Sequence, residues 1–341
     1  MQRETTDLTM AIENGVKKWS RLSNQLGDTV LSVQAFQYSP VYLHIGYHKT
    51  GSTFLQKRVF PFLDANYFKS LDATYLATSQ SYDPHQFIEL LGQACTIEEE
   101  KPTIISQETL SGRGDGDPIW NQFTIAERLY QTFPHAKILI VVRNQLEYIL
   151  SLYTMRVVNR GLERLCLSDY LTQKFEARLR GKLQYDALVN RYTSLFGFTN
   201  VLVLPYEQLA VDSADFVSQV LGFFDVTQSH KFEHAKENVG IRNERIVQIN
   251  RYINYPISVI IDFLRKYKIM SPRYYSQFAN GYFLLKRLTL NAFLGKFMDP
   301  NDNVVDFSPE WKKEIIDAFK EGNHRLADVM DQDIAQYGYP W

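Results

Sequence analysis

A lysine enclosed by two glycines and followed by two hydroxyl side chains has the composition of a binding site for a phosphate-like anion. Lys49 lies between Gly46 and Gly51 in the sequence HIGYHKTGST, which ends in Ser52 and Thr53. Glycines allow a sharp turn that brings backbone N–H groups close to a ligand. A helix that begins at this point adds a partial positive charge and unpaired donors. We therefore predict an anion-binding loop in this segment.

This loop differs from that of the nucleotide triphosphatases. Their motif, G-x-x-x-x-G-K-[ST], places the lysine after the second glycine and uses the hydroxyl group to bind magnesium. Here the glycine spacing is kept, but Lys49 lies inside the loop and Ser52 takes the usual lysine position. The dinucleotide fingerprint G-x-G-x-x-G is absent. An ordinary turn with a solvated lysine stays open as the alternative.

A second candidate anion ligand is Arg143, which follows the apolar run KILIVV at 137–142. Such a run is typical of a buried parallel strand, and ligands bind at the carboxyl ends of such strands. Asn144 can cap the helix that follows, and Ser151 lies about two turns along it. A magnesium-dependent phosphotransferase needs an aspartate at such a strand end. An arginine instead favours a second anion held by a guanidinium group, with a surface ion pair as the alternative.

The two segments together resemble the cofactor signatures of sulfotransferases that use 3′-phosphoadenosine 5′-phosphosulfate (PAPS). The resemblance runs through HIGYHKTGST and VVRNQLEYILSLY in the family's order, and it is strongest between Val41 and Tyr206. It implies a P-loop-like fold, PAPS as the sulfuryl donor and 3′-phosphoadenosine 5′-phosphate (PAP) as the product. For Tyr206, packing at the end of a strand stays open as the alternative. The residues that the resemblance assigns to the cofactor are Lys49, Thr50, Gly51, Ser52 and Thr53 at the 5′-phosphosulfate, Arg143 and Ser151 at the 3′-phosphate, and Tyr206 near the adenine.

One part of the family pattern is missing. Relatives often close a loop over the nucleotide with an arginine-lysine-glycine sequence, whereas residues 238–242 of this chain read NVGIR. The contacts of this loop, and any role of Arg242 in them, therefore stay open.

Sulfuryl transfer to an alcohol needs a base for the hydroxyl proton and positive charge at the departing phosphate oxygen. Lys49 is placed for the second task. The run TIIS at 103–106 predicts a buried strand that delivers Glu108 to the same sheet edge, where relatives carry a catalytic histidine or glutamate. Glu108 is therefore the candidate base, and a capping or surface carboxylate is the alternative. His48, inside the loop, could neutralise the sulfonate or contact the acceptor, whereas His44 is expected to be a core residue.

Strand and helix patterns alternate as far as residue 204. This alternation predicts an α/β fold with three layers, in which helices flank a central, mainly parallel sheet, and a helical C-terminal region follows. The expected strands lie near 41–46, 66–69, 102–106, 137–142 and 200–204. The expected helices lie near 52–63, 84–94, 122–133 and 144–158, with a substrate-side pair near 168–180 and 184–196. We predict a single domain, 1–341, made of an N-terminal helical extension (1–38), a cofactor-binding core (39–235) and a helical region on the acceptor side (236–341).

The tail from Ile241 to Met298 holds ten Lys or Arg residues and two acidic ones, with aromatic residues between them. The simplest interpretation is a helical cap with buried aromatic side chains. The alternatives are a groove for an anionic or sugar-rich acceptor, or peripheral contact with a membrane surface. Pro256 and Pro272 are expected to break the segment into shorter helices, and this favours the groove.

Composition limits the class of protein. With 45% hydrophobic residues and a net charge of −1, the chain can bury a large core and lacks the basic character of nucleic-acid-binding domains. Cys95 and Cys166 lack metal-site spacing and form no disulfide framework. The N-terminal segment has no signal-peptide core, and no stretch reaches the ~18 apolar residues of a membrane span. These features favour a cytoplasmic enzyme without a transmembrane segment or a bound metal.

The predicted function is one-step transfer of a sulfuryl group from PAPS to an acceptor hydroxyl on a saccharide or glycoconjugate, with no metal required. A small-molecule alcohol, phenol or amine is the close competitor as acceptor. The alternatives from other classes are a magnesium-dependent nucleotide kinase or NTPase and a non-catalytic nucleotide-binding module. The displaced Lys49 and the position of Arg143 disfavour the kinase, and Glu108 disfavours the binding module.

Overall fold

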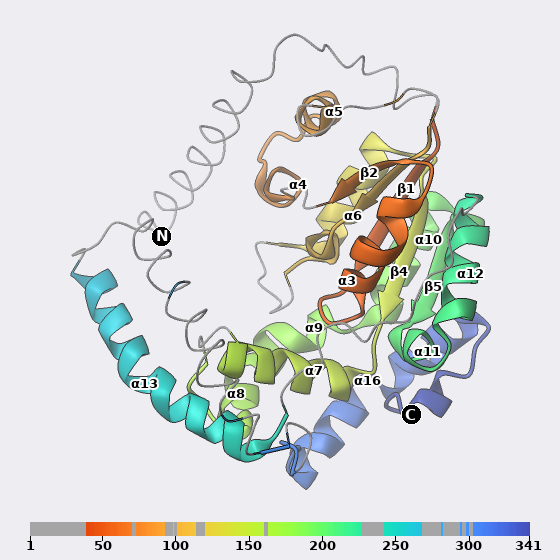
Figure 1. The fold of residues 1–341 in the computed structure, drawn as a ribbon. Helices are drawn as coiled ribbons and strands as arrows, with labels where there is room; N and C mark the ends of the chain where they lie inside the picture. Colours follow the sequence, from red (N-terminus) through yellow and green to blue (C-terminus); the bar gives the residue numbers. More distant parts are fainter. Residues whose placement is uncertain are drawn as a thin grey trace.

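Five parallel strands form the centre of the molecule (Figure 1). The structure, a computed structural model, describes residues 39–69, 73–92, 98, 101–113, 120–159, 163–226, 242–267, 281, 294, 298–299 and 303–341. The strands are β1 (Val41–Gly46), β2 (Asn66–Lys69), β3 (Thr103–Ser106), β4 (Lys137–Val142) and β5 (Val201–Pro205). Their order is β2-β3-β1-β4-β5, and every pairing between them is parallel. The predicted parallel sheet is therefore confirmed.

Helices cover both faces of this sheet. Successive strand residues point to opposite sides, and apolar residues on each side pack against these helices. Leu43, Ile45 and Ile140 pack with the helices of one face. Tyr42 and Val141 pack with those of the other face, so β4 is buried on both sides and reads as an unbroken apolar run. The predicted three-layer α/β fold is confirmed. The first face is covered by α6 (Gln122–Thr132), α7 (Gln145–Thr154), α10 (Tyr185–Phe196) and α16 (Pro309–Met330), and the second by α3 (Ser52–Phe54), η1 (Leu55–Val59), η2 (Phe60–Phe62) and α12 (Ser213–Phe224).

The helices predicted between the strands are present, with one difference in their placement. The pair predicted near 168–180 and 184–196 exists, but α10 packs on β4 and β5 instead of forming a substrate-side insertion. The parallel neighbours β4 and β5 can be joined only by a crossover connection, and α10 is the helix of this connection that covers the sheet. The other helices and turns are α4 (Thr74–Thr78), α5 (Pro84–Gly92), η3 (Glu108–Ser111), η4 (Met155–Asn159), α8 (Leu167–Lys174), η5 (Phe175–Leu179), α9 (Arg180–Lys182), η6 (Phe198–Asn200), α11 (Tyr206–Val211), α13 (Glu244–Lys266) and η8 (Ile334–Tyr337).

Helix α13 packs against η4 and runs along the outer side of the molecule (Figure 1). It continues through Pro256, so the predicted break at this residue is wrong, and Pro272 lies outside the described residues. Both Pro256 and Tyr252 are exposed. Water can therefore bond to the carbonyl group of Tyr252, which loses its helical partner at the proline.

The last residues of the chain return to the core. Helix α16 packs against α7, α10 and β5, and Tyr339, just after η8, is buried. Within the C-terminal region, α16 therefore helps to cover one face of the sheet. The extension predicted for residues 1–38 lies outside the described residues. Within the described ranges, no helix has both the length and the apolar character that crossing a membrane requires.

Candidate active site

The loop between β1 and α3 has a left-handed backbone at two positions. The φ angle is 68° at Lys49 and 76° at Gly51, a conformation that most side chains disfavour. A Cβ added at Gly51 would lie 2.7 Å from the side chain of Leu209, and one at Gly46 would lie 2.5 Å from Ser52 Oγ. Close packing therefore requires both glycines, and the loop turns as sharply as an anion-binding loop must.

The hydroxyl groups of this loop differ in their contacts. Thr50 is buried and donates to the carbonyl oxygen of Tyr47, so it stabilises the loop itself. Ser52 is also buried, but its Oγ has no hydrogen-bond partner among the residues that the structure describes. Thr53, beside it, is half-buried. A buried donor without a partner costs on the order of 1–3 kcal/mol. A ligand whose oxygens accept a hydrogen bond from Ser52 Oγ would offset this cost.

A neutral imidazole lies behind the loop. His44 Nδ1 forms a hydrogen bond of 2.7 Å with Ser106 Oγ, and burial lowers the pKa of His44 to about 3. A Cβ added at Gly46 would lie 3.2 Å from the His44 ring. His44 is therefore a core residue next to the loop, and its ring adds no positive charge there.

Arg143 joins the two predicted anion motifs at the carboxyl end of β4. Its Nη1 donates to the carbonyl oxygen of Lys49 at 2.8 Å, and its Cζ lies 4.8 Å from the ring centroid of Tyr206. The hydroxyl of Tyr185 donates to the carbonyl oxygen of Arg143 at 2.8 Å. Within the described part of the chain, Arg143 Nε is buried without a hydrogen-bond partner. The guanidinium group therefore lies beside the loop and keeps a donor for a ligand.

One carboxylate, Glu147, contacts two arginines at this position. Its Oε2 lies 3.5 Å from Arg143 Nη2 and 2.6 Å from Arg242 Nη2. Residues 238–241 lie outside the described residues, but Arg242 is thus placed beside the arginine that was predicted to bind a 3′-phosphate. Glu147 was not among the residues predicted from the sequence. Its position four residues after Arg143 on the predicted helix is the signal that could have found it.

Ser151 lies on α7, two turns after Arg143, as predicted. It is half-buried, and its carbonyl oxygen accepts a hydrogen bond from Thr154 Oγ1 at 3.3 Å. No hydrogen bond joins Ser151 to Arg143 in the described part of the molecule. Its proposed contact with a 3′-phosphate thus stays a prediction.

A half-buried carboxylate that the sequence did not indicate, Glu207, lies near Arg143. Glu207 Oε1 accepts from the backbone N–H of Asn144 at 3.1 Å, and Oε2 accepts from the hydroxyl of Tyr339 at 3.0 Å. Burial raises the pKa of Glu207, although these hydrogen bonds and the charge of Arg143 act in the opposite direction. Glu207 therefore ties the start of α7 to the end of the chain.

Besides Lys49, the candidate catalytic side chains are Glu108 and His48, and these two lie close together. Glu108 begins η3 and is separated from β3 by Gln107 alone, and its Oε2 lies 3.8 Å from His48 Nε2 in the loop. The exposed fractions are 21% for His48 and 29% for Glu108, so both side chains are accessible to a second substrate. The backbone N–H of Gln107 donates to the carbonyl oxygen of His44 at 3.3 Å, which holds this turn against β1.

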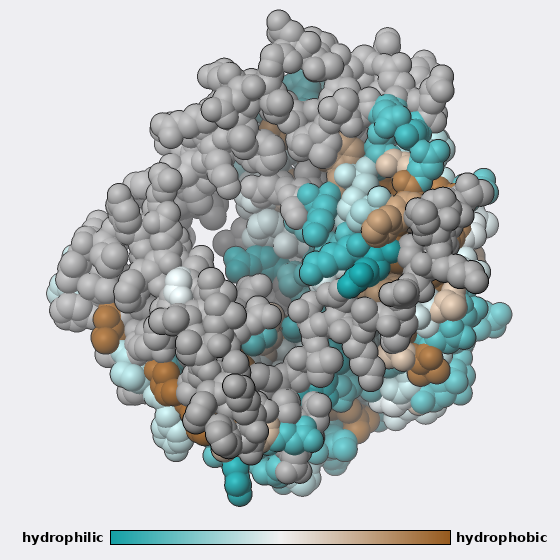
Figure 2. Space-filling view, in the orientation of Figure 1, coloured by the Kyte–Doolittle hydropathy of each residue, from teal (hydrophilic) through white to brown (hydrophobic). Residues whose placement is uncertain are grey.

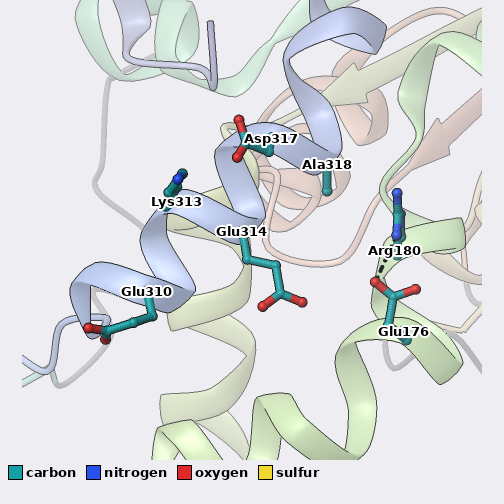
Figure 3. Close-up of a pocket in the computed structure, with 7 residues that line it drawn as sticks. All are labelled: Glu176, Arg180, Glu310, Lys313, Glu314, Asp317 and Ala318. Atoms are coloured by element: carbon teal, nitrogen blue, oxygen red, sulfur yellow. Dashed lines mark hydrogen bonds and ion pairs between the residues drawn. The ribbon is translucent and has the colours of Figure 1, made fainter.

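A surface pocket lies away from these residues, between α16 and the η5–α9 segment (Figure 3). Its volume is about 440 Å³, and none of the predicted site residues lines it. Within the described ranges, no group of three or more His, Cys, Asp or Glu side chains is arranged to hold a metal ion. Cys166 is a free thiol, and Cys95 lies outside the described residues. The lining residues of the pocket are Glu176, Arg180, Glu310, Lys313, Glu314, Asp317 and Ala318.

Comparisons with known proteins identify the family of the chain. The family model described as "Sulfotransferase domain" matches residues 41–268, which is more than half of the chain. The structure of a sulfotransferase from Alicyclobacillus acidocaldarius aligns with a TM-score of 0.53 and 16% identity, covering 87% of this chain and 98% of that chain. A search of curated protein sequences gave no match.

Two further solved structures are less similar. Mouse sulfotransferase SULT7A1 complexed with PAP aligns with a TM-score of 0.39 and 16% identity over 58% of this chain and 64% of that chain. The sulfotransferase domain from the curacin biosynthetic pathway aligns with a TM-score of 0.34 and 14% identity over 56% and 75%. The family match spans the strands, the loop and Arg143 described above, and the chain therefore belongs to the sulfotransferase family.

Proposed function

We propose that the protein transfers a sulfuryl group from PAPS to the hydroxyl group of an acceptor. Sulfuryl transfer itself follows from membership of the sulfotransferase family. The choice of donor rests on the hydrogen bond of 2.8 Å from Arg143 Nη1 to the carbonyl oxygen of Lys49, which joins the two proposed anion-binding elements at one sheet edge. A donor with anionic groups at both its 5′ and 3′ positions fits such a pair of elements.

The donor site is supported by two unpaired donors. Ser52 Oγ and Arg143 Nε are buried and lack partners among the described residues, so acceptor oxygens of a ligand would satisfy both. Tyr206 packs under Arg143 and supports a position for the adenine ring. When bound, PAPS supplies the activated sulfuryl group. The residues proposed to hold it are Lys49, Thr50, Gly51, Ser52 and Thr53 at the 5′ side, Arg143, Arg242 and Ser151 at the 3′ side, and Tyr206 at the base.

The proposed catalytic groups divide the work between proton and charge. Glu108 accepts the proton of the acceptor hydroxyl as that oxygen becomes a nucleophile. Lys49 offsets the negative charge that develops at the departing phosphate oxygen, where a fixed charge stabilises the transition state more than the ground state. His48, 3.8 Å from Glu108, orients the carboxylate or contacts the acceptor.

The proposed acceptor is a hydroxyl group on a saccharide or glycoconjugate, and a small-molecule alcohol, phenol or amine is the alternative. The basic, aromatic tail was considered as the acceptor groove. Exposed side chains along α13 and just after it are Tyr252 (80%), Ile260 (54%) and Tyr267 (57%), and separate hydrophobic residues lie along this helix in Figure 2. These side chains support the membrane-surface alternative for the tail. If the parent protein binds anionic vesicles and the Tyr252→Ser and Ile260→Ser variants bind them more weakly, the membrane-surface alternative is supported. If the parent protein binds no vesicles, this alternative is wrong.

The proposed function is tested by incubating the full chain with radiolabelled PAPS and two acceptor panels. One panel contains oligosaccharides, and the other contains small alcohols, phenols and amines. Transfer of label with release of PAP supports the proposal, and the labelled panel identifies the acceptor class. If neither panel is labelled and the protein instead transfers phosphate from magnesium-ATP, the proposal is wrong and the kinase alternative holds.

A further inference from the structure

A buried lysine lies at the end of α9, where the sequence gave no sign of a functional group. Lys182 is 6% exposed, and its Nζ donates to the carbonyl oxygen and Oγ of Ser111 and to the carbonyl oxygen of Gly112. The distances are 3.0 Å to Ser111 Oγ and 3.4 Å to Gly112 O. Burial of an ammonium group is costly, and lysine is among the residues that are rarely fully buried. These hydrogen bonds offset that cost.

The acceptors of Lys182 belong to the turn that carries Glu108. Ser111 is the last residue of η3, and Glu108 is the first. Ser111 Oγ donates to the carbonyl oxygen of Glu108 at 3.0 Å and contacts the carbonyl oxygen of Gly46 at 3.1 Å. Gly46 ends β1 and leads into the loop that holds Lys49. Lys182 thus holds the short turn behind Glu108 against the base of this loop.

The chain from the end of α9 to the start of α10 also contacts the other two parts of the site. Lys182 Nζ lies 4.3 Å from the ring centroid of Tyr47, the first loop residue after β1. Tyr185, three residues later, packs edge-on against Tyr47 with ring centroids 4.7 Å apart and donates to the carbonyl oxygen of Arg143. Residues 182–185 therefore connect the carboxyl ends of β1, β3 and β4.

We propose that Lys182 is a positioning residue for sulfuryl transfer, which fixes the turn Glu108–Ser111 relative to the loop between β1 and α3. The inference rests on the proposed function of Glu108 as base. A side chain without donors at position 182 would leave the carbonyl oxygens of Ser111 and Gly112 without this partner. The turn would then move, and a displacement of about 1 Å at a reacting group can lower a rate on the order of a hundredfold.

The test compares Lys182→Met with Arg180→Met, a matched control on the same helix whose side chain is 46% exposed and pairs with Glu176. Turnover is measured as release of PAP and sulfate from PAPS with water as the acceptor, and PAP affinity is measured by calorimetry. We expect Lys182→Met to lower turnover by about tenfold to a hundredfold. PAP affinity should stay within about threefold of the parent value, because the nucleotide contacts lie on other elements. Arg180→Met should change neither quantity.

A double-mutant cycle separates positioning of Glu108 from a general loss of structure. If Lys182 acts through Glu108, adding Lys182→Met to Glu108→Gln should lower turnover by less than about threefold further. An equal fold-loss in both backgrounds, a parallel loss of PAP affinity or an unchanged turnover of Lys182→Met would each overturn the inference. If Lys182→Met does not fold, Ser111→Ala takes its place in the cycle, with the same expected non-additivity. Failure of the proposed function appears separately, as unchanged turnover of Glu108→Gln alone.

Discussion

Arg143 Nη1 donates a hydrogen bond of 2.8 Å to the carbonyl oxygen of Lys49. The two residues come from motifs that lie far apart in the sequence, and the contact places the second motif directly on the first. It also braces the left-handed backbone of Lys49, because the bonded carbonyl belongs to the residue with a φ angle of 68°. Arg143 is therefore expected to shape the loop as well as to bind an anion.

Replacement of Arg143 by alanine should weaken binding of PAP more than binding of adenosine 5′-phosphate, which lacks the 3′-phosphate. A hydrogen bond to a charged group contributes on the order of 1.5–3 kcal/mol, so the affinity ratio should fall by roughly tenfold to a hundredfold. Calorimetric titration with both nucleotides measures this ratio. Arg191→Ala, which removes an arginine paired with Glu127 on another part of the surface, is the control. If the affinities for the two nucleotides fall equally, Arg143 does not bind the 3′-phosphate and only stabilises the loop.

Glu108→Gln should leave PAP affinity unchanged, since the proposed role of this carboxylate is toward the acceptor. Turnover should drop by about 10²–10⁴, the range for loss of a general base. Steady-state kinetics with PAPS and the acceptor identified by the panels, run alongside PAP titration, provides both values. Near-normal turnover would shift the role of base to His48, whose Nε2 lies 3.8 Å from the Glu108 carboxylate.

Gly51→Ala should destabilise the protein more than Gly338→Ala. Both glycines have left-handed backbones, with φ and ψ of 76° and 10° at Gly51 and 73° and 18° at Gly338. An alanine Cβ at 338 would meet no atom closer than 3.4 Å, so that variant should lose only the backbone cost of about 1–2 kcal/mol. At 51 the Cβ would approach Leu209 to 2.7 Å, which adds a steric cost.

Urea unfolding of these two variants measures the difference, and PAP titration should show loss of affinity for Gly51→Ala alone. Equal losses of stability would mean that the loop relaxes around the added methyl group.

Much of the fold could be predicted because the signals are local. The run KILIVV indicates a buried strand by itself, and Asn144 caps the next helix as its position predicts. Pro256 misled the prediction, because whether a proline ends a helix depends on the solvation of the freed carbonyl, a tertiary property. The placement of α10 likewise depended on which strands are neighbours, which local patterns do not specify.

The candidate site was predictable where it follows strand ends, and it was missed where the contact is long-range. Lys49, Glu108 and Arg143 each follow a strand, so the parallel sheet brings them to one edge. Glu207 also follows a strand, but its partner Tyr339 lies near the C-terminus. Lys182 contacts Ser111 across a sequence separation of 71 residues, and no motif marks either residue.

The pKa of Glu207 predicts a pH dependence of stability. Burial raises this pKa above its ordinary value of 4.5, so the folded protein binds the proton more tightly than the unfolded chain does. Stability from this group is therefore fully present below pH 4.5 and is lost as the pH rises through the raised pKa. Relative to Glu207→Gln, the parent protein should lose unfolding free energy over that window. Urea unfolding at a series of pH values tests this, and a difference that is flat or grows with pH would contradict it.

The central claim is that Lys49 and Arg143 form a site for a nucleotide with anionic groups at its 5′ and 3′ positions. Calorimetric titration of the full chain with PAP and with ATP, each with and without magnesium, tests it most directly. We predict that PAP binds equally well with and without magnesium and more tightly than ATP. Tight binding of ATP that requires magnesium, with no binding of PAP, would contradict the account.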